Sequence, residues 1–291
     1  MSKKQILLFA IFLLVFGWNS NAQLFWKISG NGLSKTSYLF GTHHIIDKSK
    51  IKNFDKILEI CGQTDAAVGE MVLNDPTLQG KLMQGAIMKE GTIKDLVSPE
   101  DYTLLDNEFK QLIGAGMDQL GKMKPMMLST LYTIMVYMKT KNITTQPEAV
   151  DKLFQNKSAE NGKKIMGLET VEDKIEVLFN KIPLKRQAEL LVKGIKEKNK
   201  GLDVLDKLND VYVSEDLKKI AALVKEEQGD MTDEEMAMFV DVRNNNWMKK
   251  LPALMNEQSC FIAVGCLHLT GETGLLNQLK KSGYKLEPVV L

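Results

Sequence analysis

Residues 38–44, YLFGTHH, and residues 261–268, FIAVGCLH, share one pattern, an apolar run that ends in Gly-x-x-His. All three histidines of the chain lie in these two stretches. Each stretch is followed by a predicted helix, Asn53 to Gly62 or Gly274 to Lys281, and then by a second apolar run. A strand that ends at a glycine and presents a polar side chain just beyond its end is how open α/β sheets place reactive groups. The chain is therefore expected to begin and end with similar β-Gly-x-x-His-α-β units.

This pattern predicts an α/β (α+β) fold with a central mixed β-sheet made of two pseudo-symmetric β-Gly-x-x-His-α-β halves and a large helical insertion. Apolar residues at helical spacing predict the insertion, or lid, over about residues 76–161 and further helices over about 181–257. The predicted core consists of residues 23–75, 162–180 and 258–291. We expect residues 23–291 to form a single domain.

A methionine-rich stretch, residues 117–138, lies within the predicted insertion. Methionine fills irregular gaps in protein interiors, which favours a role in core packing. The alternative is a plastic apolar surface that contacts the substrate.

The first 22 residues resemble a cleavable signal peptide. Two basic residues, Lys3 and Lys4, precede an apolar stretch over residues 6–17 and small residues that offer a cut after Ala22. The apolar stretch is short for a membrane span, so an uncleaved anchor is the less favoured alternative. We therefore predict export to the periplasm or the medium, with no stable membrane insertion after cleavage.

Composition and charge narrow the class of partner. The formal charge is +1, and it becomes −1 if residues 1–22 are removed with their two lysines. Neither value favours a nucleic-acid partner.

Two of the three cysteines, Cys260 and Cys266, lie on one predicted strand and its exit, too far apart to bridge each other. Buried thiols are the default interpretation for these two and for Cys61.

Polar residues that follow the predicted strands define a candidate site. His44 and His268 close the two Gly-x-x-His patterns, which open with Gly41 and Gly265. Histidines are frequent ligands and acid/base groups, and their matched context strengthens the case for function over a structural role. Neighbouring residues on an extended segment point in opposite directions, so His43 is not expected to face the same centre as His44.

Two glutamates and an arginine extend this candidate site. Glu70 lies in an apolar run from Ala66 to Leu73, where a carboxylate is unfavourable unless it is paired or binds a cation. The alternative is a strand-end residue that faces water. Glu169 follows another apolar run and points to the same crevice, or else it is an acid at a helix N-terminus. Arg243 and Asn244 begin a polar run on a predicted helix, which marks a site element or a solvated helix end.

Together these motifs resemble those of the TraB/GumN family, whose relatives include the Tiki proteases and, distantly, the erythromycin-esterase-like proteins. The similar motifs, in family order, are FWKISGNG at 25–32, the first Gly-x-x-His, Glu70, GLET at 167–170, Arg243-Asn244 and the second Gly-x-x-His. Residues 149–151 are Ala-Val-Asp where relatives often have Gly-Val-Asp, and residues 172–174 are Glu-Asp-Lys in place of Glu-Glu-Gln. The resemblance implies an α/β core with a helical insertion and, for the Tiki branch, metal-dependent peptide hydrolysis.

The favoured hypothesis is a divalent-metal hydrolase that acts as a peptidase on a peptide or protein substrate. His44, His268 and Glu70 are predicted to hold Mn, Co or Zn, since two imidazoles and a carboxylate suit these ions. Such a metal would lower the pKa of a bound water. A glutamate that does not ligate the metal, Glu70 or Glu169, would then act as general base.

Arg243 is predicted to hold a substrate carboxylate or to stabilise the oxyanion, because its donors form a fixed fork. Asn244 and His43 complete the predicted substrate contacts.

Two alternatives stay open at this point. One is a metal-free, esterase-like hydrolase with His44 as base and glutamates that orient it, and the other is an exported protein that binds a peptide or small ligand without turnover.

Overall fold

The computed structural model describes residues 23–291, and the predicted signal peptide, residues 1–22, lies outside them. The described residues form a six-stranded sheet in the order β4-β3-β5-β2-β1-β6. The strands are β1 Phe25–Gly30, β2 Ser37–Thr42, β3 Ala66–Gly69, β4 Lys164–Gly167, β5 Cys260–Gly265 and β6 Tyr284–Pro288. The sheet is mixed and carries many helices, which confirms the predicted fold class.

The order of the strands brings the two Gly-x-x-His patterns together. Strand β5 pairs in parallel with β2 on one side and with β3 on the other, and β4 pairs in parallel with β3. Strand β1 is antiparallel to both β2 and β6. The carboxyl ends of β2, β3, β4 and β5 therefore lie at one edge of the sheet, which is where open α/β sheets bind ligands.

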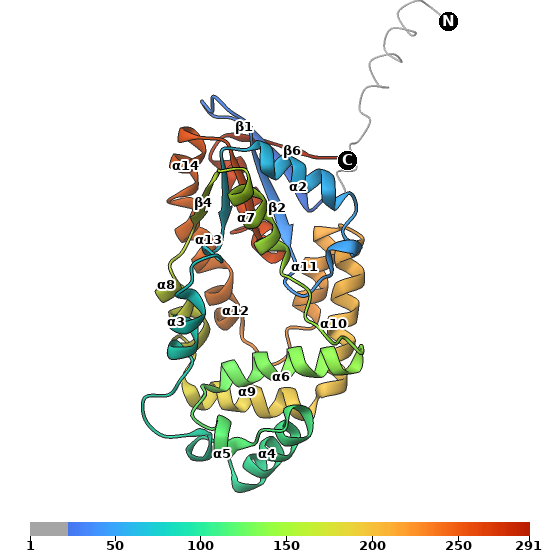
Figure 1. Cartoon of the computed structure of the whole chain (residues 1–291), viewed down its shortest axis with the longest axis vertical. Coiled ribbons are helices and arrows are strands. Elements are labelled where there is room, and N and C mark those ends of the chain that lie inside the picture. Colours follow the sequence, from blue (N-terminus) through green and yellow to red (C-terminus); the bar gives the residue numbers. More distant parts are fainter. Residues whose placement is uncertain (1–22) are drawn as a thin grey trace, which may run out of the picture.

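Both faces of the sheet are covered. The first unit crosses from β2 to β3 through α2 (Phe54–Gln63), and the second from β5 to β6 through α15 (Leu275–Lys281). Helix α7 (Val150–Glu160) lies beside α2 across the strands (Figure 1), and its Phe154 ring centroid lies 4.7 Å from that of Phe261 on β5. Neighbouring positions on β5 are equally buried, as expected when helices cover both faces.

A second layer is entirely helical. Figure 1 shows α4, α5, α6 and α9 at the end of the molecule opposite the sheet, and these helices enclose a separate apolar core. The helices not yet given are α3 Leu78–Gly85, α4 Pro99–Ile113, α5 Met117–Leu120, α6 Pro125–Thr140, α8 Val171–Ile175, α9 Leu184–Lys196, α10 Lys198–Val213, α11 Leu217–Glu226, α12 Asp233–Phe239, α13 Asp241–Met248 and α14 Leu251–Glu257. Short 3-10 segments are η1 Lys48–Lys50, η2 Ile93–Asp95 and η4 Cys266–Leu269, and a π-helical turn, η3, spans Glu176–Asn180.

The predicted insertion, residues 76–161, does not belong to this layer as a whole. Helix α7 lies within those residues but packs on β3, β4 and β5, because Val150 and Phe154 join the core of the sheet. Met117 of the methionine-rich stretch is buried in the helical core, as predicted, whereas Met138 lines a cavity. Contact with a substrate stays a prediction.

Local sequence determines where several helices begin. Ser98 accepts a hydrogen bond from the backbone of Asp101 and caps α4, with proline in the first turn, as predicted. Thr232 and Glu235 form the predicted capping box of α12. Thr170 caps α8 in the same manner, so Glu169 stands between the end of β4 and a helix.

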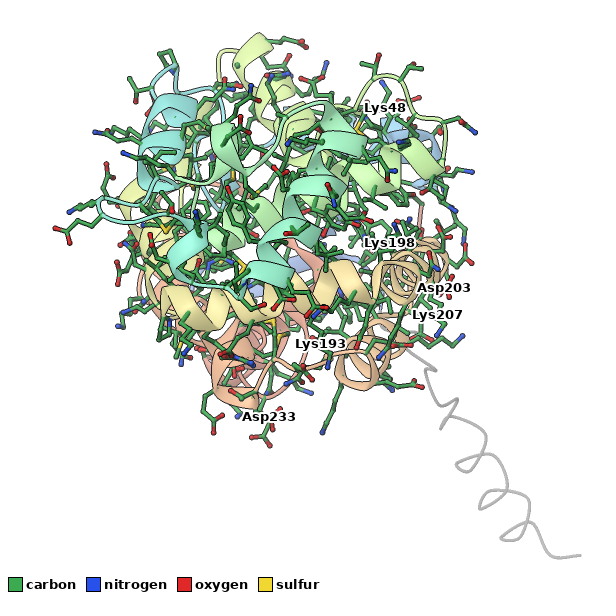
Figure 2. All side chains as sticks on the ribbon, turned by 90° about the horizontal axis from the view of Figure 1, so that it is seen from below. Lys48, Lys193, Lys198, Asp203, Lys207 and Asp233 are labelled. Atoms are coloured by element: carbon green, nitrogen blue, oxygen red, sulfur yellow. The ribbon has the colours of Figure 1, made fainter. Side chains whose placement is uncertain are left out.

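The outer surface of the helical layer is charged with both signs. Figure 2 views the molecule from this end and labels several charged side chains, among them Lys193 of α9 and Lys198 at the start of α10. Lys198 pairs with Glu108 at 3.1 Å, and Lys207 pairs with Glu227 at 2.7 Å. Among residues 23–291, no helix has the length and apolar character that crossing a bilayer requires.

Candidate active site

A cavity of about 540 Å³ lies between the carboxyl edge of the sheet and helices α6, α10 and α12. Its polar end is formed by His44, Glu70, Lys174, Arg243 and Gly265. Gly265 is the last residue of β5, Glu70 directly follows β3, and His44 lies two residues after the end of β2. The cavity thus joins the ends of strands that are far apart in the sequence.

Arg243 of α13 is the hub of the polar end and is only 7% exposed. Its Nε and Nη2 donate to the two oxygens of Glu169 at 2.9 and 2.6 Å, and Nη2 also donates to Glu70 Oε2. Its Nη1 donates to Nε2 of His268 at 2.9 Å. The guanidinium also lies 4.7 Å from the Trp247 ring centroid, a cation–π contact. One buried side chain therefore connects the ends of β3, β4 and β5.

Lys174 of α8 adds a second positive charge to the two glutamates. Its Nζ lies 2.7 Å from Glu70 Oε2 and 3.5 Å from Glu169 Oε1. Burial alone would raise the pKa of Glu70, but Lys174 and Arg243 outweigh this and hold its pKa well below the usual range. Two carboxylates and two cations thus balance each other where water is largely excluded.

His268 is held neutral in this cluster. Its Nδ1–H donates to Oδ1 of Asn244 at 2.7 Å, so Nε2 is free of a proton and accepts from Arg243. Burial, assisted by Arg243 and Lys174, lowers the pKa of His268 to about 3. Asn244 is fully buried and also donates to the backbone oxygens of His268 and Thr273. Asn244 therefore orients His268. It was predicted to contact the substrate, but it does not line the cavity.

His44 faces the cavity from the end of β2, and its side chain is 63% exposed. Its Nδ1 lies 3.3 Å from Oδ2 of the buried Asp151 on α7, whose other oxygen accepts a hydrogen bond from Thr42 at 2.8 Å. The hydrogen bond to Asp151 is the main cause that raises the pKa of His44. With Nδ1–H directed at the carboxylate, Nε2 is left for chemistry in the cavity.

His43 is turned away from this pair. Its ring packs edge-on against Tyr212 at 5.3 Å, and its Nδ1 accepts from the backbone of Ile45 at 3.3 Å. Burial, with the adjacent His44, lowers the pKa of His43 to about 4, so it is neutral at physiological pH. The two adjacent histidines thus have different hydrogen-bond partners, although both line the cavity. The strand ends at Thr42 and His44 lies in a turn, so the alternation expected of an extended segment does not apply here.

Gly265 keeps a shared space open between the strand ends. A Cβ at this position would lie 3.4 Å from Glu70 Oε1, 3.6 Å from His268 Cδ2 and 3.9 Å from His44 Nε2. The three predicted metal ligands therefore border one small region. Gly41 has a different role, because a Cβ there would come within 3.0 Å of the backbone of Cys266. It lets β2 approach the turn that follows β5.

Two site residues were not predicted, Asp151 and Lys174. Asp151 matches the family's Gly-Val-Asp pattern, in which this chain differs only at Ala149, whereas Lys174 stands where relatives often have Gln. The acid that contacts His44 is thus Asp151, and not a glutamate as expected for the metal-free alternative. All three cysteines are buried and unpaired, and burial raises the pKa of each thiol to about 12. Cys266 lines the cavity, whereas Cys61 and Cys260 do not.

The donors for a metal are present but engaged. Among residues 23–291, no group of three or more His, Cys, Asp or Glu side chains is arranged to hold a metal ion. His268 Nε2 and Glu70 are bonded to Arg243, and Glu70 also to Lys174. Of the three predicted ligands, only His44 therefore keeps a ring nitrogen that is not hydrogen-bonded within the protein. As arranged, the three residues do not fit a metal, and the predicted metal stays a prediction.

The fold and the site define an α/β protein with a buried arginine–carboxylate–histidine cluster at one end of an apolar cavity. The TraB/PrgY/gumN family model matches residues 24–288, so the chain belongs to the TraB/PrgY/gumN family. This confirms the resemblance seen in the sequence motifs. Comparisons with curated proteins and with solved structures found no match.

Proposed function

We propose that this protein is an exported hydrolase that cleaves an acyl bond, an ester or a peptide bond, with His44 as general base. The observation that carries the proposal is the His44–Asp151 pair, which opens onto a cavity lined at the same end by Lys174 and Arg243. Export rests on the signal-peptide pattern of residues 1–22.

The base is oriented from behind. Asp151 accepts a hydrogen bond from Nδ1–H of His44. Nε2 of His44 is then unprotonated and can take a proton from a water molecule that attacks the acyl carbon. Thr42 donates to the other Asp151 oxygen, which fixes the carboxylate. A histidine base held in place by a carboxylate, here His44 and Asp151, is an arrangement that supports general-base hydrolysis.

Lys174 is the group best placed to stabilise the oxyanion. Arg243 already uses its donors on Glu169, Glu70, His268 and a backbone oxygen. Lys174 lines the cavity, and an ammonium group has three donors that can rotate. The role first predicted for Arg243 therefore falls to Lys174, and Arg243 holds the carboxylates and His268 in place.

A metal-dependent peptidase is the second candidate. It is favoured by the common space beside Gly265, which His44, His268 and Glu70 border. In that case these three residues would hold Mn, Co or Zn, and the ion would supply an activated water. Arg243 would first have to release His268 and Glu70.

The test compares hydrolysis of 4-nitrophenyl butyrate and of a peptide mixture by wild-type protein and His44→Ala, each with and without a chelator. We expect the variant to lose about a hundredfold or more in kcat and the chelator to have no effect. An unfolding curve shows that the variant is folded. Activity that the chelator abolishes and Mn, Co or Zn restores would favour the metal candidate. Full activity in His44→Ala would refute both, and a ligand bound without turnover would indicate a binding protein.

A further inference from the structure

The cavity has a second, apolar end that the proposed chemistry does not use. Away from the sheet its walls are formed by aliphatic and aromatic side chains of four helical elements, α6, η3, α10 and α12. The side chains that form these walls are Ile134, Met138, Leu178, Leu205, Leu208 and Phe239. All six are half-buried, so they present apolar surface to the cavity without being packed into a core. An apolar surface of this kind marks a binding site.

Polar groups on these walls are few: Thr130, Thr133, Tyr137 and Gln146, of which Thr130 and Tyr137 are hydrogen-bonded within the protein. The Thr130 hydroxyl donates to the backbone oxygen of Met126 at 3.0 Å. The Tyr137 hydroxyl accepts from Asn209 at 2.9 Å. A peptide backbone carries an N–H and a C=O at every residue, so most of its polar groups would find no partner among so few side chains, which is unfavourable. A hydrocarbon chain has no such groups and gains from burial.

The volume limits the size of the occupant. Since liquid water takes about 30 Å³ per molecule, the 540 Å³ of the whole cavity holds on the order of 18 non-hydrogen atoms. Continuity fixes the orientation, because the same cavity reaches His44 and Lys174. A chain that fills the apolar end would therefore place the carbonyl carbon to which it is attached beside the proposed base.

We infer that the substrate is an ester or amide whose acyl portion is a long hydrocarbon chain, bound in the apolar end of the cavity. The inference rests on the proposed hydrolase function and names its substrate class. The water oxygen forms a bond to the acyl carbon while His44 takes a proton from the water. The bond to the leaving oxygen or nitrogen then breaks, and that atom receives the proton from His44. The products are a fatty acid and an alcohol or amine.

The experiment measures kcat/KM for 4-nitrophenyl acetate, butyrate, octanoate and dodecanoate below their micelle-forming concentrations. Burial of each methylene is expected to raise kcat/KM by up to about fourfold, so octanoate should exceed butyrate by tenfold or more. A second measurement is binding of dodecanoate to His44→Ala by displacement of a fluorescent fatty acid. It reports occupancy of the cavity without turnover.

Ile134→Trp adds bulk to the apolar wall. It should lower kcat/KM for dodecanoate and octanoate by at least tenfold and weaken dodecanoate binding, and it should lower kcat/KM for acetate by a much smaller factor. Val290→Trp is the matched control, because Val290 is 79% exposed and does not line the cavity. It should change none of these values.

The outcomes separate the two proposals. Hydrolysis of acetate with no gain from longer chains would overturn the acyl-chain inference and leave the hydrolase function standing. A preference for apolar peptides over every acyl ester would also overturn it. If no ester is hydrolysed, the hydrolase proposal fails for esters. In that case dodecanoate binding that Ile134→Trp weakens still supports a hydrocarbon-chain site, and absence of binding refutes it.

Discussion

Removal of Arg243 should destabilise the protein strongly, because two buried carboxylates, Glu70 and Glu169, would lose their arginine partner. Arg243 is 7% exposed, and its partners Glu70 and Glu169 are 8% and 9% exposed. The loss of one member of a buried, hydrogen-bonded charge network typically costs about 3–5 kcal/mol. Lys174 still contacts both glutamates, which places Arg243→Ala toward the lower end of that range.

A double-mutant cycle separates the charge network from simple loss of packing. Glu169→Gln removes one of the two buried negative charges. It should therefore lower the free energy of unfolding more in the wild type than in the Arg243→Ala variant. The expected coupling energy between the two positions is about 1–3 kcal/mol. Urea unfolding, followed by circular dichroism, gives the four free energies.

Arg186 supplies a matched control within the same protein. It also forms a two-pronged pair, with Glu235 at 2.9 and 3.1 Å, but its side chain is 29% exposed. Arg186→Ala should therefore cost only about 0–1 kcal/mol. If Arg243→Ala is no more harmful than Arg186→Ala, or if it is additive with Glu169→Gln, the reasoning about a buried hub is wrong.

The remaining predictions concern pH and space in the site. Asp151→Asn should move the acidic limb of the kcat/KM profile to lower pH, since Asp151 raises the pKa of His44 above 6.5 and only the neutral ring is a base. Gly265→Ala should lower kcat severalfold while urea unfolding stays within about 0.5 kcal/mol, because its methyl group enters the shared space in ordinary contact. The melting temperature should fall below pH 6.5, because the unfolded chain takes up protons that His43 and His268, with pKa values near 4 and 3, do not bind. The raised pKa of His44 has the opposite effect on the melting temperature, but it is one group against two. A melting temperature that rises on acidification would contradict the assignment of His43 and His268 as buried, neutral groups.

The strand ends could be predicted from the sequence because they follow from local pattern. A glycine after an apolar run marks the exit of β2, β3, β4 and β5, and the polar residue behind each is found at one edge of the sheet. The exact end of β3 was less predictable: the strand stops at Gly69, so Glu70 lies just outside it instead of within a longer strand. An apolar run continues past the strand because Met71 packs beneath α3 and α8.

The partners of these residues could not be predicted, because they come from helices that cross the sheet. Helical spacing indicates which face of α7 is apolar, but not that Asp151 at its start reaches the histidine after β2. Lys174 lies on α8, whose position depends on contacts with α3 far away in the sequence. Arg243 was predicted as a site residue, but its role as a link between three strand ends follows only from the parallel order of those strands.

The most direct test of the central claim is rescue of His44→Ala by imidazole. Because the His44 side chain is 63% exposed and lines the cavity, free imidazole can enter the space that this side chain leaves. Hydrolysis by the variant should rise with imidazole concentration, follow the fraction of neutral imidazole as pH changes, and exceed the rate of imidazole without protein. A folded variant that hydrolyses as fast as the wild type, or that imidazole does not accelerate, would contradict the assignment of His44 as the base.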